Sequence, residues 1–317
     1  MRRLIRSIVR ALREWLSEDE GKRASSLSPQ DPVIFDNEYQ AINRSMDVLL
    51  RDPQCRTRPH YAWGVLAGAA LGKALGYSRI SVIEFGVAGG AGLVAMERAA
   101  ELTEQLAGIH VDVYGFDSGS GLPKPQDYRD VPFAWAEGYY PIDVQKLQRR
   151  LRRAQLKLGL IRETIPIFLE SAPAPIAFVG VDLCLYSSAR EALRLFCAEH
   201  QFLLPRVTAS FRCINGKYYT DYTGERLAIS EFNSENSMRK LSPIYNLRSL
   251  VPADSLREIP GWPEWLYTLH LFNHPRYGDP DSMQKSMGID VDGKDIHLPV
   301  GASPNEALAN TYRNQST

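Results

Sequence analysis

An acidic side chain and a cluster of glycines follow one apolar run, and their spacing could bind a ligand. Residues 81–93 read SVIEFGVAGGAGL, in which β-branched residues end at Glu84 and four glycines follow within seven residues. Glycine lets the backbone bend sharply and lets a ligand approach closely. The N-terminus of a following helix favours a polar or anionic group. The stretch is therefore either a nucleotide-binding turn or a plain tight turn between strand and helix.

The spacing of these glycines departs from the dinucleotide-binding fingerprint G-x-G-x-x-G. Gly86, Gly89, Gly90 and Gly92 give G-x-x-G-G-x-G, and Ala88 stands where the second glycine of the fingerprint would be. Because any turn between a strand and a helix can contain glycines, this pattern alone leaves both a dinucleotide and S-adenosylmethionine open as ligands.

The position of Glu84 favours a cationic ligand. A carboxylate just before the turn would repel a pyrophosphate, whereas it would attract the ammonium or sulfonium group of S-adenosylmethionine. The next apolar run, HVDVYGFD, ends at Asp117, whose carboxylate could accept hydrogen bonds from both hydroxyls of a ribose. A turn cap formed by Asp117 before Ser118 and Gly119 would equally explain this residue.

Apolar runs alternate with segments of helical spacing from residue 61 onward, which predicts βαβ units. We therefore predict an α/β fold with a Rossmann-like, doubly wound, mainly parallel sheet and helices on both faces. Ligands bind such sheets at the carboxyl ends of the strands, so Glu84 and Asp117 should lie at one edge. The predicted strands cover residues 79–85, 110–117, 162–170, 176–183, 206–214 and 265–273, and the predicted helices cover residues 61–76, 92–107, 144–159, 188–200 and 224–240.

Composition restricts the classes of partner. The chain has 37 Lys and Arg residues and 37 Asp and Glu residues, and a net charge of zero gives no long-range field for nucleic acid. Its 4 cysteines form no C-x-x-C pair and no zinc spacing, which indicates reduced thiols in a cytoplasmic protein. No apolar run reaches the length that spans a bilayer.

We predict three parts: residues 1–32, a basic amphipathic helix with a linker; residues 33–279, the ligand-binding domain; and residues 280–317, an irregular tail. The first 16 residues, MRRLIRSIVRALREWL, place apolar side chains on one helical face and arginines on the others. Such a helix could dock on its own domain or on another subunit of a homo-oligomer. Peripheral contact with a membrane surface and an organelle transit peptide are the alternatives.

Several stretches together resemble the class I S-adenosylmethionine-dependent methyltransferases, in particular the macrocin O-methyltransferase-like group. The phrases FDSxxGLP and DxxLYSS are more specific than the glycine turn, and all the stretches occur in the family's order. The resemblance implies a seven-stranded sheet with an antiparallel last strand, and methylation of a small molecule at oxygen. The stretches are VIEFGVAGGAG (82–92), YGFDSGSGLP (114–123), GLIRETIP (159–166), VDLCLYSSAREAL (181–193) and LHLFNHPRYGD (269–279).

The resemblance also implies roles for individual residues. Glu84 would lie near the methionine end of S-adenosylmethionine, Gly86 and Gly90 would pass beneath it, and Asp117 would hold the ribose. Three further residues would lie near the adenine or the ribose: Ser118, Thr164 and Ile165.

Methyl transfer to oxygen needs an oriented acceptor and removal of the acceptor's proton. Asp182 ends the fourth predicted strand beside the cofactor, and His274 follows the last strand. We take both as candidate bases. The simpler explanations are a cap on the helix that begins near Ser187 and a surface turn before Pro275.

The chain departs from the family at the positions that would bind a metal. Cys184 stands where family members often have a second acid, and residues 212–213 read RC near the place where metal-dependent members have a pair of acids. A hard cation such as Mg²⁺ needs several oxygen ligands, and Asp182 alone cannot supply them. Asp221 and Glu225 could assist only in a favourable register. We therefore expect a mechanism without Mg²⁺.

Two other functions stay open at this point. A relative that binds the nucleoside but has lost catalysis would fit Cys184 and residues 212–213, and an NAD-dependent oxidoreductase would need a different glycine spacing. Residues 123–141 and 215–224 are rich in aromatic side chains. We expect these loops to form the acceptor pocket, since long loops at ligand-binding edges are commonly lids.

Overall fold

The computed structural model describes residues 36–279, 287–289 and 295–297 of the 317-residue chain. The predicted N-terminal helix and linker, with its alternatives of subunit or membrane contact, lie outside these residues, as does most of the predicted tail. Within the tail, β8 (Met287–Ile289) and β9 (Asp295–His297) pair as antiparallel strands. Among the described residues, no helix combines the length and the apolar character needed to cross a membrane.

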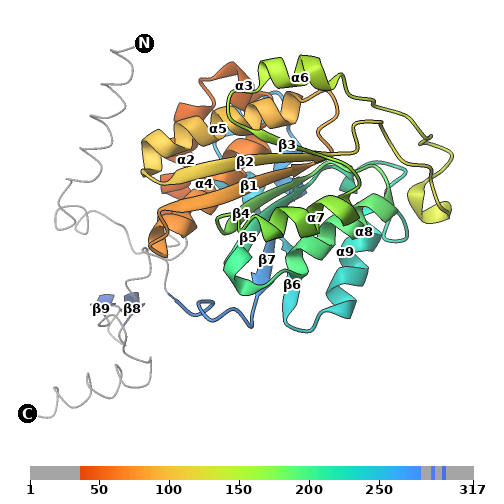
Figure 1. Cartoon of the computed structure of the whole chain (residues 1–317). Coiled ribbons are helices and arrows are strands. Elements are labelled where there is room, and N and C mark those ends of the chain that lie inside the picture. The colour runs from red at the N-terminus through yellow and green to blue at the C-terminus, as the bar shows by residue number, and fades with distance from the viewer. Residues whose placement is uncertain (1–35, 280–286, 290–294, 298–317) are drawn as a thin grey trace, which may run out of the picture.

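The central sheet has seven strands in the order β3-β2-β1-β4-β5-β7-β6 (Figure 1). The first five strands of this order run parallel, and β7 is antiparallel to both of its neighbours. The predicted Rossmann-like α/β fold, with its antiparallel last strand, is confirmed. The strands are β1 (Arg79–Phe85), β2 (His110–Asp117), β3 (Gln155–Leu158), β4 (Ile176–Val181), β5 (Leu203–Phe211), β6 (Arg239–Pro243) and β7 (Leu266–Leu271).

Helices cover both faces of the sheet (Figure 1). On one face α4 packs on β4 and β5 and against α2 and α5, and on the other face α8 packs between α7 and α9. The helices are α2 (Asp36–Leu49), α3 (Pro53–Arg56), α4 (Pro59–Ala74), α5 (Ala91–Ala107), α6 (Val144–Arg150), α7 (Ile161–Glu170), α8 (Tyr186–Leu193), α9 (Gly224–Glu235) and α10 (Leu247–Leu250), with short 3₁₀ turns η1 (Tyr128–Asp130), η2 (Arg194–Cys197), η3 (His200–Phe202), η4 (Arg212–Ile214), η5 (Ala253–Leu256) and η6 (Trp262–Trp265).

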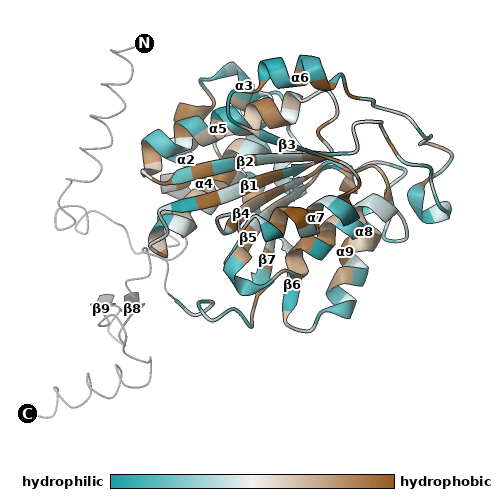
Figure 2. Ribbon diagram, viewed as in Figure 1, coloured by the Kyte–Doolittle hydropathy of each residue, from teal (hydrophilic) through white to brown (hydrophobic). Residues whose placement is uncertain are grey.

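The inner strands are buried along nearly their whole length. Every residue of β4 is buried, and in β1 only Arg79 is exposed. Parallel strands that are covered on both faces contain continuous apolar runs, and the runs at residues 79–85 and 176–183 therefore predict these two strands from the sequence alone. Figure 2 shows the contrast between the apolar strands and the hydrophilic outer surface of α6.

Two predicted elements are wrong. Residues 162–170 form helix α7 instead of a strand, because Ile165 and Phe168 fall on one helical face and are buried. The predicted helix over residues 144–159 ends at Arg150, and its last part is the edge strand β3. The side chain of Glu97 produces this break, since its buried Oε1 accepts backbone N–H groups of the turn between α6 and β3.

Small residues allow α4 to lie close to the sheet. A Cβ atom added at Gly64 would stand 2.2 Å from the Phe178 ring, and one added at Gly68 would stand 2.8 Å from the Ala177 Cβ. This close approach places the first turn of α4 next to the ends of β1 and β4.

We predict that Gly64→Val lowers the free energy of unfolding by about 1–3 kcal/mol, because overpacking forces neighbouring atoms to shift. Urea denaturation measures this change. Gly278→Val is the control, since a Cβ atom there meets nothing within 4 Å. Equal unfolding free energies for the two variants would contradict the close packing of α4.

Candidate functional site

A cavity of about 760 Å³ lies at the carboxyl ends of β1, β2, β4 and β5. It brings together Glu84, Gly86, Asp117, Ser118 and Asp182, which the sequence analysis placed at one edge of the sheet. The loops that follow these four strands supply most of the wall. The other lining residues include Arg58, Trp135, Tyr139, Tyr140, Arg162, Cys184, Ser187, Ser188, Glu191, Arg212, Cys213, Lys217, Tyr218 and Tyr219.

The glycine turn between β1 and α5 forms the floor of the cavity. Gly86 has φ +86°, and a Cβ atom there would stand 2.3 Å from the backbone oxygen of Asp182. Only glycine permits this approach of the β1 turn to the end of β4. Gly90, by contrast, does not line the cavity: it precedes α5 with φ +78°, and an added Cβ atom would collide with Leu147 of α6.

Glu84 is a buried carboxylate with one free oxygen. Its side chain is only 2% exposed. The hydroxyl of Tyr61 donates to Oε1 at 2.8 Å, and Oε2 has no hydrogen-bond partner. Burial raises the pKa of this carboxyl well above its usual value, although the hydrogen bond from Tyr61 opposes the shift. The site therefore holds an acceptor that a cationic donor would satisfy.

Tyr61 is a site residue that the sequence analysis did not identify. It lies in the first turn of α4 and packs edge-on against Phe178, with ring centroids 5.7 Å apart. Gly180 of β4 makes room for its ring, because a Cβ atom there would stand 2.7 Å away. The only signal in the sequence is a tyrosine at the start of a helix of small residues, and nothing in that pattern assigns it to Glu84.

Asp117 links the turn that follows β1 to the turn that follows β2, beneath the cavity. Its Oδ1 accepts from the Gly119 N–H at 2.8 Å, and its Oδ2 accepts from the Ala88 N–H at 3.0 Å. The turn cap considered from the sequence is therefore present, and the same carboxylate also lines the cavity. Ser118 lies beside it and donates its hydroxyl to the Gly121 carbonyl at 2.7 Å.

Asp182 is paired with a cation. Arg212 Nη1 lies 3.0 Å from Asp182 Oδ2, and the Cys213 thiol lies 3.9 Å from Oδ1. Arg212 also stands over the Trp265 ring at 6.0 Å. Arg212, which the sequence analysis noted only as a departure from the family, is therefore the direct partner of the candidate base Asp182.

Glu225 and Asp221 do not assist Asp182. Glu225 is fully buried, and its two oxygens accept from the Leu183 N–H at 3.1 Å and the Cys213 N–H at 2.7 Å. Asp221 forms an ion pair with Arg226. Within residues 36–279, no group of three or more His, Cys, Asp and Glu side chains could hold a metal ion.

Two residues expected beside the adenine are one helical turn away from the cavity. Thr164 donates its hydroxyl to the Leu160 carbonyl at 3.1 Å, and Ile165 is buried in the core. The cavity is lined by residues 159–162 instead. Residues 162–170 were predicted as a strand, but they belong to helix α7, and only the first residues of this helix line the cavity.

His274 lies away from the cavity. Strand β7 is antiparallel to β5, so the end of β7 lies next to the start of β5. There the buried His274 ring contacts the His200 carbonyl at 3.2 Å and accepts from the Arg276 N–H at 3.0 Å. The prediction of His274 as a catalytic base is not compatible with this position at the opposite edge of the sheet.

The two aromatic loops meet at the cavity. Trp135 stacks on Tyr219 with ring centroids 6.4 Å apart and an interplanar angle of 21°, and Phe133 contacts Tyr218 at 5.5 Å. Trp135 and Tyr219 both line the cavity. The two loops that we expected to form the acceptor pocket therefore both line this cavity.

No protein-family model and no curated protein matches the chain. The calicheamicin methyltransferase CalS11 is similar to it in structure, with 18% identity, a TM-score of 0.44, and coverage of 83% of this chain and 91% of that protein. An O-methyltransferase from Bacillus cereus in complex with SAH has 10% identity and a TM-score of 0.31, over 67% and 84% of the two chains. The plantazolicin methyltransferase BpumL in complex with SAH has 10% identity and a TM-score of 0.33, over 73% and 95%. Because these values are low, the function has to be inferred from the geometry of the site.

We predict a pH-dependent effect of Glu84→Gln on stability. Burial raises the pKa of Glu84 above the ordinary value of 4.5, so its contribution to stability is full below that pH and is lost as the pH rises toward the folded-state pKa. Urea denaturation over a pH series should show that the unfolding free energy of the variant increases relative to that of the wild type as the pH rises. Glu163→Gln, at an exposed position, is the control, and a difference for Glu84→Gln that does not change with pH would refute the assignment.

Proposed function

We propose that the chain is an S-adenosylmethionine-dependent methyltransferase that methylates a small molecule at oxygen. The observation that carries this proposal is the pair of carboxylates, Glu84 and Asp117, which line one cavity on either side of the glycine turn. S-adenosylmethionine has a cationic sulfonium, an ammonium group and a ribose, and these are the groups that two separated carboxylates would bind.

The residues present fit this cofactor at two points. An unpaired buried acceptor costs about 1–3 kcal/mol, so a cationic donor at Glu84 Oε2 would relieve a cost that the free protein carries. Each oxygen of Asp117 accepts one backbone N–H. Because a carboxylate has about four lone-pair positions in total, Asp117 can also accept hydrogen bonds from ribose hydroxyls.

The protein's part in the reaction is to orient the acceptor and to take up its proton. When bound, S-adenosylmethionine supplies a methyl group on a positively charged sulfur. Placing the acceptor atom in line with that group accounts for much of the rate. Asp182 lines the same cavity, and we assign it as the base because Arg212 engages only Oδ2 at close distance. The acceptor's hydroxyl proton would pass to Oδ1.

We propose that this chemistry does not depend on Mg²⁺. Arg212 supplies a positive charge next to Asp182, at the position where a bound cation would need further oxygen ligands. Glu225 is fully buried and does not line the cavity, so its oxygens are not placed to provide them. The guanidinium would hold Asp182 in place and balance its charge.

A nucleoside-binding protein without catalysis is the second candidate. The ion pair between Arg212 and Asp182 favours it, because the guanidinium occupies one oxygen of the carboxylate that would have to take up the acceptor's proton. An NAD-dependent oxidoreductase has less support, since Glu84 lies where a pyrophosphate would approach and Ala88 interrupts the fingerprint. The cysteines at positions 55, 184, 197 and 213 are free, which supports the cytoplasm as the compartment.

Calorimetric titration tests the cofactor. We expect S-adenosylhomocysteine to bind and NAD not to bind, and Asp117→Ala to weaken binding by about 10- to 100-fold, because hydrogen bonds to a charged group are lost. Asp112→Ala is the matched control on β2. It removes an ion pair with Arg79 outside the cavity, so it should leave the affinity unchanged.

Absence of binding by S-adenosylhomocysteine would overturn the proposed function. Equal affinities for the wild type and Asp117→Ala, with folding verified by circular dichroism, would overturn the ribose assignment alone.

The metal-independent mechanism has its own test. Transfer of a labelled methyl group from S-adenosylmethionine to the small molecules of a cell extract should continue in excess EDTA, and Arg212→Gln should reduce it. Complete loss of transfer in EDTA, with recovery on addition of Mg²⁺, would show that the assignment of Arg212 is wrong. Absence of transfer by a protein that binds the cofactor would favour the second candidate.

A further inference from the structure

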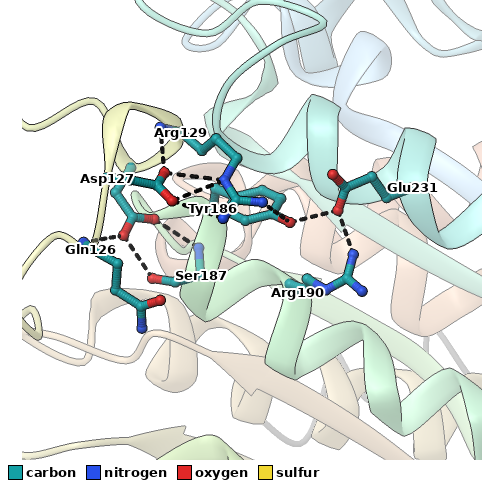
Figure 3. A network of polar contacts seen from close by, with 8 residues as sticks. Gln126, Asp127, Arg129, Tyr186, Ser187, Arg190 and Glu231 are labelled. Carbon is teal, nitrogen blue, oxygen red and sulfur yellow. Dashed lines mark hydrogen bonds and ion pairs between the residues drawn. The ribbon is translucent and has the colours of Figure 1, made fainter.

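The loop over residues 118–143, which forms one wall of the cavity, is attached at its middle to helix α8 (Figure 3). The attachment is the carboxylate of Asp130, which is 0% exposed. Its Oδ1 accepts from the Ser187 N–H at 2.8 Å, and its Oδ2 accepts from the Gln126 N–H at 2.8 Å and the Ser187 hydroxyl at 3.0 Å. Both oxygens thus accept hydrogen bonds from inside the protein.

This attachment reaches the catalytic edge of the sheet directly. Ser187 is in the first turn of α8, where the free N–H groups and the helix dipole favour a carboxylate. The same helix follows Asp182 at the end of β4, and Ser187 and Ser188 line the cavity. Asp130 therefore joins the loop to the element that carries the proposed base.

A second contact supports the first. The Arg129 guanidinium lies 4.5 Å from the centre of the Tyr186 ring and donates to its hydroxyl at 3.0 Å. Tyr186 in turn donates to Glu231 Oε2 at 2.5 Å, and Arg190 pairs with the same carboxylate (Figure 3). The middle of the loop is in this way connected to both α8 and α9.

The backbone after Asp130 is bent sharply toward the cavity. Val131 is fully buried and has φ +54°, a conformation that β-branched residues rarely adopt. Such a conformation persists only where surrounding contacts hold it in place. The Val131 carbonyl accepts from the Ala134 N–H at 2.9 Å and the Trp135 N–H at 3.2 Å. This turn brings Trp135 to the cavity wall.

Trp135 is the cavity-lining side chain that this turn positions. Its ring stacks on Tyr219 of the other aromatic loop, and its buried Nε1 has no hydrogen-bond partner. Trp135 lines the cavity, so this residue contributes an unpaired donor to the cavity wall. Its position depends on the turn that Asp130 and Val131 form.

We propose that Asp130 is a positioning residue, which fixes Trp135 and the first turn of α8 in the acceptor half of the cavity. By the acceptor half we mean the part next to Asp182, in which the methyl acceptor would bind. The loop is accordingly a fixed wall at its middle and not a lid that opens as one piece. The inference rests on the proposed function for the meaning of the acceptor half, but the attachment itself can be measured without any ligand.

Asp130→Asn tests the attachment with little change in size. Whichever way the new amide turns, its NH₂ group faces a backbone N–H of Gln126 or Ser187, so a hydrogen bond is replaced by two opposed donors. We expect amide hydrogen-exchange protection over residues 126–137 to fall by about 10- to 100-fold. Protection of β1 and β4 should be unchanged. Acrylamide quenching of Trp135, taken as the difference from the same protein with Trp135→Phe, should rise.

Glu137→Gln is the matched control, because it makes the same carboxylate-to-amide change at an exposed position of the same loop. It should leave both signals as in the wild type. Ser187→Ala, which removes one of the three hydrogen bonds, should lower protection by about 2- to 10-fold and serves if Asp130→Asn does not fold.

The proposal is overturned if the folded variants keep wild-type protection and quenching, if Glu137→Gln shows the same loss, or if the loss extends equally to β1 and β4. Affinity for S-adenosylhomocysteine is measured on the wild type, Asp130→Asn and Glu137→Gln, and should not change. If the wild type does not bind it, the proposed function fails while the test of the attachment remains readable.

Discussion

The site depends on a carboxylate held out of water beneath a glycine turn. Glu84 is 2% exposed and has one hydrogen-bond donor, Tyr61. Burying a carboxylate with so few partners is costly, and the packing around it leaves no room for rearrangement. A Cβ atom at Gly92 would stand 1.8 Å from Glu84 Oε1, and one at Gly180 would collide with the Tyr61 ring. The position of the carboxylate is thereby determined by the sheet and by α4 together.

The two ends of the cavity differ in charge balance. At one end Glu84 has no cation within ion-pairing distance in the described structure, and at the other end Asp182 is paired with Arg212. A cationic ligand would lie next to Glu84, the carboxyl group without a cationic partner, and a neutral acceptor would lie next to the ion pair of Asp182 and Arg212. This difference gives the proposed cofactor and the proposed acceptor separate places in one cavity.

Buried acids hold the irregular backbone around the site. Glu97 accepts from the turn that ends α6, Glu225 joins the loops after β4 and β5, and Asp130 attaches the aromatic loop to α8. In each case one carboxylate satisfies two or more backbone N–H groups that no helix or strand provides for. Loops that approach a ligand cannot pair with each other as strands do, so side chains have to hold them in shape.

The sequence by itself was sufficient for the buried strands of the parallel sheet and for the carboxylates at their ends, because continuous apolar runs and glycine turns are local patterns. It did not predict the edge strand β3, which lay within a predicted helix. It identified Glu84, Asp117 and Asp182 as residues of one edge. It did not determine that residues 161–170 are helical, that Tyr61 meets Glu84, or that Arg212 pairs with Asp182. His274 was misplaced even though the resemblance implied an antiparallel last strand, because the end of such a strand lies beside the start of β5 and not beside its carboxyl end. These features arise between segments far apart in the chain, where packing of the whole molecule chooses the partner of each polar group.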